Sequence, residues 1–245
     1  MVFATLSVAA LCQVHPSVRM DELKVTPPQF AGIENVAAFL ETREAQSLNK
    51  YVALHFQYPE TRNGRIYEGT ELVQFVVSPT GEISDIQVIN SLSHDIDAEV
   101  IRILRSTSGM WIPGTSGGKP TAMNSAVSLV IKTGGTEEDA LKKDFQEMAQ
   151  CSFKRAGKLW FDKCKPQRAL KAYNRAMRYR PNDEGLLLMR GLCKYELGDK
   201  EGARVDWCRY RDCGGTVDFE GAFLTDHKDQ MKGYQEVVDM LKTKK

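Results

Sequence analysis

Residues 69–90 read G-T-E-L-V-Q-F-V-V-S-P-T-G-E-I-S-D-I-Q-V-I-N, and this stretch decides the fold of the first half of the chain. Its two runs of β-branched and aromatic residues predict two strands, Gly69–Ser78 and Ile83–Asn90. A turn at Pro79-Thr80-Gly81 joins them, because proline presets one turn angle and glycine supplies another. Neither face of the second run is purely apolar, so the sequence does not decide which face of this strand meets the core.

A helix is predicted directly after this hairpin, starting at His94 or Asp95. Asp95 and Asp97 lie near its beginning, where the helix dipole favours negative charge. The apolar positions recur at helical spacing, as one buried helix face requires. They are Ile96, Val100, Ile103 and Leu104.

The glycine-rich segment 110–120, M-W-I-P-G-T-S-G-G-K-P, does not fit a phosphate-binding loop. Such a loop needs an earlier glycine and a hydroxyl residue after its lysine, but Pro113 and Pro120 stand at these positions. We interpret the segment as a connector, with Trp111 as a core side chain. The stretch Asn124–Lys132 then alternates and predicts a third strand. Its apolar face consists of Val127, Leu129 and Ile131.

Composition excludes several classes of function. The 245 residues carry 33 basic and 32 acidic side chains, so no strong basic field attracts nucleic acid. The six cysteines include no CxxC pair and the four histidines are scattered, which argues against a metal site. No recognisable nucleophile turn or pair of catalytic carboxylates is present. We therefore expect neither an enzyme nor a bound cofactor.

The N-terminal stretch Val2–Val14 is apolar and uncharged, but shorter than the roughly 20 residues that a membrane helix needs. We expect residues 1–14 to be either a truncated secretory signal sequence, lacking its basic start, or only an apolar terminus.

Several anchors in residues 25–133 together resemble the C-terminal domain of TonB-type energy transducers. The preceding segment Pro27–Leu40 is similar to the lead-in of members from Bacteroidota-like bacteria, although the link Glu41–His55 is longer than usual. The anchors are Gln57-Tyr58-Pro59-Glu60, Glu68-Gly69, the turn at Pro79-Thr80-Gly81, Trp111-Ile112-Pro113-Gly114 and the final alternating strand.

The resemblance implies a periplasmic, cell-envelope module that binds TonB-dependent outer-membrane receptors during energy-coupled transport of nutrients. In the family, a receptor segment adds as a strand to the sheet edge, and inner-membrane motor proteins pull on it. The chain would be anchored in the inner membrane if its N-terminus is incomplete. The receptor-binding positions carried over to this sequence are Gln57, Tyr58, Pro59, Asn124, Ser125, Ala126, Val127, Ser128, Leu129, Val130 and Ile131.

The second half of the chain contains an internal repeat. After a linker and helix at residues 134–149, three pairs of residues stand 34 positions apart: Gly157 and Gly191, Ala169 and Ala203, Tyr173 and Trp207. This period is similar to tetratricopeptide repeats, in which small residues allow close helix crossings. We expect two repeats over residues 150–215 and a capping helix at 228–243. The fold class is thus α+β, a small sheet domain followed by an all-α repeat domain.

Such repeats usually present a concave face to a protein or peptide. The candidate groove residues are Arg155, Lys158, Arg190 and Lys194, which could meet acidic peptides; the alternative is a solvated helix face. The second functional hypothesis is therefore a periplasmic scaffold or adaptor without motor coupling, binding protein partners through its repeats.

Overall fold

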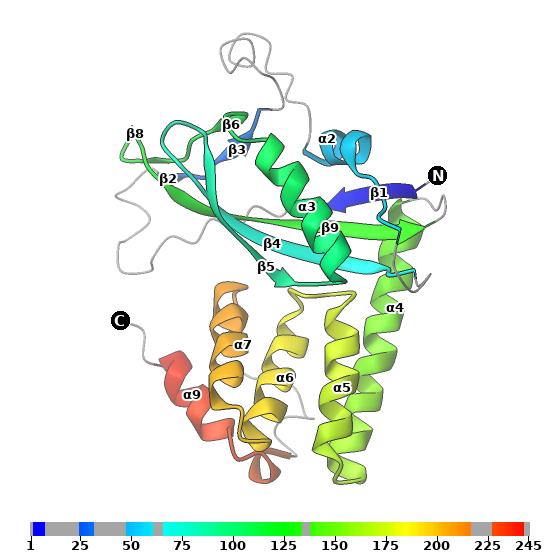
Figure 1. Ribbon diagram of the computed structural model, residues 1–245. Coiled ribbons are helices and arrows are strands. Elements are labelled where there is room, and N and C mark those ends of the chain that lie inside the picture. The colour runs from blue at the N-terminus through cyan, green and yellow to red at the C-terminus, as the bar shows by residue number, and fades with distance from the viewer. Residues whose placement is uncertain are drawn as a thin grey trace. The chain divides into compact units, whose positions relative to one another are not determined.

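The computed structural model describes residues 2–7, 25–31, 48–60, 66–133, 138–216 and 227–242. The chain forms two compact units, residues 1–138 and 139–245 (Figure 1).

The first unit is built on an antiparallel four-stranded sheet with the order β1-β9-β4-β5. The predicted hairpin and third strand are β4, β5 and β9, and the predicted helix between them is α3, which lies across the sheet (Figure 1). The main elements are β1 (Val2–Ser7), α2 (Leu48–His55), β4 (Gly69–Val77), β5 (Ile83–Asn90), α3 (His94–Ser106) and β9 (Met123–Thr133). Two-residue strands form further pairs: β2 (Val25–Thr26) with β7 (Thr115–Ser116), β7 with β8 (Lys119–Pro120), and β3 (Gln29–Phe30) with β6 (Trp111–Ile112).

Helix α3 begins where the sequence predicts it. The Ser93 hydroxyl caps the helix by accepting the Ile96 N–H at 3.3 Å. The four predicted apolar residues are all fully buried and pack with the inward side chains of the sheet. This contact closes the core of the first unit.

Trp111 fills that core, as the sequence analysis predicts. Its side chain is 5% exposed, and its ring makes edge contacts with Phe30 and Phe75 at centroid distances of 5.4 and 5.1 Å. The indole N–H donates to the Thr107 hydroxyl at 3.0 Å, so its polar atom is satisfied. Gly81 is required beside it, because its φ is +82° and a Cβ there would lie 2.2 Å from the Trp111 carbonyl oxygen.

The ambiguous face of β5 has a structural cause. The register against β4 shifts twice, and Asp85 adopts a positive φ of 49° between two of the paired positions. A bulge of this kind inserts a residue and reverses the alternation of the side chains. Ile83, Ile86 and Val88 therefore all pack against the core, although their spacing is not that of a regular strand.

Glu71 on β4 is a fully buried carboxyl group. One of its oxygens accepts the Leu92 N–H at 2.9 Å, which ties the strand to the start of the α3 region. Burial, with the neighbouring carboxyl group of Asp97, raises the pKa of Glu71 to about 9. The group is thus protonated in the folded protein at neutral pH and ionised in the unfolded chain.

The free energy of unfolding should therefore fall as the pH rises from about 5 to about 9, by up to about 1.4 kcal/mol per pH unit. The reason is that unfolding releases the Glu71 proton in this window. Denaturant unfolding of the Glu71→Gln variant should show a much flatter pH dependence, while the exposed-site control Glu82→Gln should follow the wild type. An unchanged slope in Glu71→Gln would contradict this assignment.

The second unit is helical. It contains α4 (Glu138–Gly157), a π-helical turn η1 (Lys158–Asp162), α5 (Pro166–Met177), α6 (Glu184–Glu196), α7 (Lys200–Asp212), a 3₁₀ turn η2 (Lys228–Gln230) and α9 (Tyr234–Lys242). The helix expected in the linker 134–149 is the first part of α4. The described cysteines of this unit are unpaired thiols: Cys151, Cys164, Cys193, Cys208 and Cys213.

Residues of the 34-residue period occupy the core of this unit. Ala169, Ala203, Tyr173 and Trp207 are all 0% exposed. A Cβ on Gly191 would lie 2.3 Å from the Trp207 Nε1, so the glycine permits a close approach between α6 and α7. The tetratricopeptide assignment itself stays a prediction.

The predicted capping helix at 228–243 differs in extent. Only Tyr234–Lys242 is α-helical, with η2 before it, and between them Met231 has an extended backbone (φ −113°, ψ 101°). The Met231 side chain is buried, as are Val237 and Leu241 of α9. The buried, extended residue Met231 thus separates two short helical segments that the sequence periodicity predicts as one helix.

Candidate functional site

Strand β9 is the predicted receptor-binding strand. Along one edge it pairs with β4 without interruption, from Gly69 opposite Ile131 to Val77 opposite Met123. Its core-facing residues Val127, Leu129 and Ile131 are buried, as the alternation predicts. Recognition along such a strand must come from the backbone of its other edge, since an edge offers unpaired N–H and C=O groups.

The remaining predicted residues of β9 vary in exposure. Asn124 is exposed, Ser125 and Ala126 are buried, and Ser128 and Val130 are half-buried.

The second edge of β9 is partly occupied by the chain itself. β1 pairs antiparallel with it, from Val2 opposite Thr133 to Ser7 opposite Ser128. Within the described residues, no strand lies on this edge beside Asn124–Val127. Residues 2–7, assigned by sequence to a truncated signal or an apolar terminus, thus lie on the edge predicted to receive a receptor. The sequence pattern did not predict this pairing, because an uncharged apolar run fits a signal sequence as well as it fits a strand.

The segment Gln57–Pro59 follows α2. Gln57 is hydrogen-bonded to α3, and Tyr58 to the segment that precedes β4. The Gln57 N–H donates to the Glu99 carboxylate at 2.9 Å, and Glu99 also pairs with Arg102 at 2.7 Å. The Tyr58 hydroxyl accepts the Tyr67 N–H at 2.7 Å. The hydrogen bonds of the described residues do not join this segment to β9, but the Tyr58 side chain packs against the core that contains Val127, Leu129 and Ile131.

Residues 55–130 match the family model of the Gram-negative bacterial TonB protein C-terminal region. The match covers 76 of the 245 residues, which include α3, β4, β5 and most of β9. No curated protein matches the chain.

The match supports a TonB-type C-terminal domain in this part of the chain. It supports a TonB-like role in energy-coupled transport, a cell-envelope location, and interaction with outer-membrane receptors in general. Among the helices of the described residues, none has both the length and the apolar character that a bilayer span demands.

The four cations predicted for the helical unit fall into different environments. Arg190 and Lys194 of α6 both pair with Asp206 of α7, at Nε to Oδ2 and Nζ to Oδ2 distances of 2.8 and 2.9 Å. Asp206 is fully buried, so both cations neutralise a carboxylate that lies inside the helix packing. Lys158 is exposed on η1.

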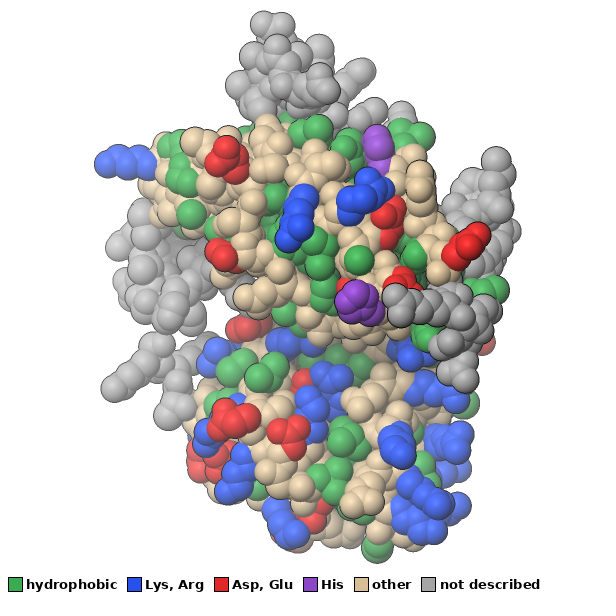
Figure 2. All heavy atoms as spheres, in the orientation of Figure 1, with side chains coloured by type: hydrophobic (Ala, Val, Ile, Leu, Met, Phe, Trp, Pro, Cys, Tyr) green, Lys and Arg blue, Asp and Glu red, His purple; other side chains and the backbone are tan. Residues whose placement is uncertain are grey.

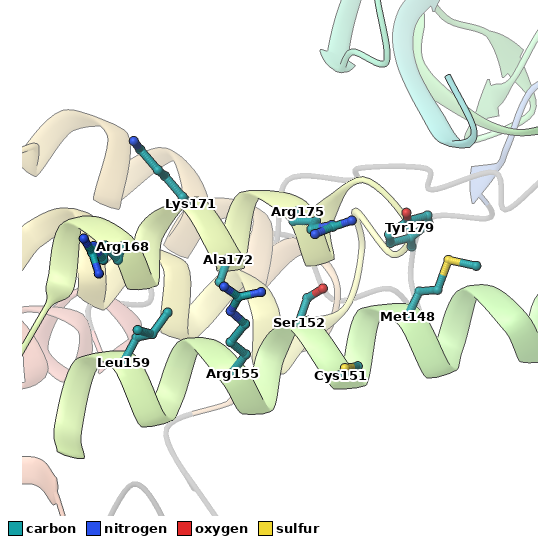
Figure 3. A pocket seen from close by; sticks show the side chains of 10 residues that line it. All are labelled: Met148, Cys151, Ser152, Arg155, Leu159, Arg168, Lys171, Ala172, Arg175 and Tyr179. Atoms are coloured by element: carbon teal, nitrogen blue, oxygen red, sulfur yellow. The ribbon is translucent and has the colours of Figure 1, made fainter. Parts of the chain in front are cut away.

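Of these four cations, Arg155 lines a groove between α4 and α5 with a volume of about 580 Å³, whose lining residues do not include the other three (Figure 3). Three further cations of α5, Arg168, Lys171 and Arg175, line it as well. They are not among the groove residues predicted from the sequence, although their spacing of three and four residues places them on one helix face. The remaining lining residues are Met148, Cys151, Ser152, Leu159, Ala172 and Tyr179.

Replacing Asp206 with alanine should lower the free energy of unfolding by up to about 3–5 kcal/mol, because two partly buried cations lose their buried counter-charge. The matched control is Glu201→Ala, whose ion pair with Arg204 at 3.1 Å is largely exposed and should contribute at most about 0.5 kcal/mol. Urea unfolding measures both. Equal effects of the two substitutions would show that Asp206 does not organise the α6–α7 contact.

Proposed function

We propose that this chain is a periplasmic TonB-like protein that binds outer-membrane receptors by strand addition along the outer edge of β9, in energy-coupled nutrient transport. The observation that carries the proposal is the position of β9. It is paired with β4 on one side, and on the other it meets only β1 among the described strands, within a segment that matches the TonB C-terminal family. The proposal assigns binding, and no catalysis, to the chain.

The pairing of β1 supports the proposal, because it is itself an antiparallel addition to this edge. A receptor segment that begins beside Asn124–Val127 can extend along β9 by replacing β1 residue by residue. Roughly five ladder hydrogen bonds at about 1 kcal/mol each give about 5 kcal/mol, a dissociation constant of roughly 0.2 mM. Such a weak grip suits repeated binding and release.

A second candidate function is a scaffold or adaptor that binds protein partners through tetratricopeptide-like repeats, without motor coupling. Two observations favour it. β1 already covers part of the β9 edge, and the helical unit carries a groove whose charged lining residues are all cations.

Amide chemical-shift titration with extended peptides from candidate outer-membrane receptors tests the proposal. Shifts should concentrate at Asn124–Ile131, and deletion of residues 2–7 should tighten binding by about tenfold, because the competing strand is gone. The variant Ala4→Pro/Leu6→Pro should act like the deletion while keeping the length, since proline cannot donate to a strand ladder.

A receptor peptide with a central proline is the matched control and should bind much more weakly. Shifts confined to residues 150–215 would favour the scaffold. Equal affinity in the wild type, the deletion and the proline variant would contradict addition at the β1 position.

A further inference from the structure

The α4–α5 groove carries charge of one sign. Its charged lining residues are Arg155 from α4 and Arg168, Lys171 and Arg175 from α5, with no carboxylate among the lining residues. All four side chains are exposed, and no ion pair within the described residues engages them. Figure 2 shows Lys and Arg side chains gathered over the side of the helical unit where α4 and α5 lie.

The cations follow a helical spacing. Arg168, Lys171 and Arg175 stand three and four residues apart, so they form a row of about 10 Å along one face of α5. Like charges at this spacing destabilise an isolated helix slightly, and α5 has no acidic residue in its first turn to offset them. A ligand with carboxylates at the same axial spacing would remove that repulsion.

The floor of the groove is apolar. Met148 is 40% exposed, and Leu159, Ala172 and Tyr179 line the groove beside it. In Figure 3, Arg155 and Ser152 of α4 and Leu159 of η1 point toward α5, Ala172 points back toward α4, and Lys171 points away from α4. An apolar floor between flanking charges is the form that receives one side of an amphipathic helix.

The two faces of α5 differ in their surroundings: one lies in the core of the helical unit, and the other lines the groove. On the core face Ala169, Tyr173 and Ala176 are fully buried in the core shared with α6. In a stacked helical array, an outer face left without a neighbour is either a polar cap or the place where a further helix packs. The groove on this face is lined by cations and apolar side chains without a carboxylate, so its charge is complementary to that of an acidic helix.

We propose that the α4–α5 groove binds an acidic amphipathic helix of a partner protein. Its apolar side chains lie against Met148 and Leu159, and its carboxylates meet Arg155, Arg168 and Arg175. The inference deepens the scaffold function and does not depend on strand addition at β9.

Fluorescence anisotropy with the full chain tests it. The probe is a labelled synthetic helix of about four turns, with leucine on one face and glutamate flanking it at i, i+3 and i+7 spacing. The variant Arg155→Gln/Arg168→Gln/Arg175→Gln should weaken binding by at least about tenfold, because three charge-assisted contacts are lost. The matched control Lys163→Gln/Lys165→Gln/Arg178→Gln makes the same charge change at exposed positions that do not line the groove and should change binding less than about twofold.

Any of the following results would overturn the proposal. One is equal weakening by the groove and control variants, which would show only general charge attraction. Another is equal binding of a probe with glutamine in place of glutamate, or no saturable binding of the acidic probe. The third is arginine-dependent binding of phosphatidylglycerol vesicles without binding of the acidic probe, which would assign the groove to a lipid surface. The receptor-peptide titration uses a different ligand and locates its binding residue by residue, at β9 or in the helical unit, so failure of one proposal is distinguishable from failure of the other.

Discussion

The uninterrupted ladder between β4 and β9 is the interaction on which the first unit depends. The ladder runs the length of β4 and places Val127, Leu129 and Ile131 against the core. It also makes β9 the outer strand of the β9-β4-β5 part of the sheet, so the other edge of β9 is left for β1 or a partner. Every functional statement about the sheet follows from this placement. A long strand whose side chains are committed to the core can recognise a partner chiefly through its backbone.

The sequence specifies this part of the fold through strong local signals. The Pro79-Thr80-Gly81 turn, the apolar face of α3 and the alternation of β9 each have a local physical cause, and each predicted element is present. The partner of the outer β9 edge could not be predicted, because Val2–Ser7 has no periodic pattern that distinguishes a strand from a signal sequence. The buried face of β5 could not be predicted either, because the bulge at Asp85, where φ is positive, reverses the alternation of side chains between the two faces.

In the helical unit, spacing predicted the packing better than it predicted the charges. Ala169, Tyr173, Ala203 and Trp207 are buried as the 34-residue period requires. Arg190 and Lys194 were predicted from the sequence to line a groove. In the structure both pair with Asp206, which lies on the next helix at the α6–α7 contact. Sequence spacing gives the face of one helix, but not the counter-charge that another helix brings to it.

The central claim is that a receptor segment and β1 compete for one edge of β9. Hydrogen exchange of the full chain, measured residue by residue with and without a receptor peptide, tests this most directly. The account predicts that the amides of residues 2–7 lose protection when the peptide binds, while those of Asn124–Val127 gain it and Ser128–Ile131 remain protected. Peptide binding that leaves residues 2–7 as protected as before, with no change at Asn124–Val127, would contradict the claim.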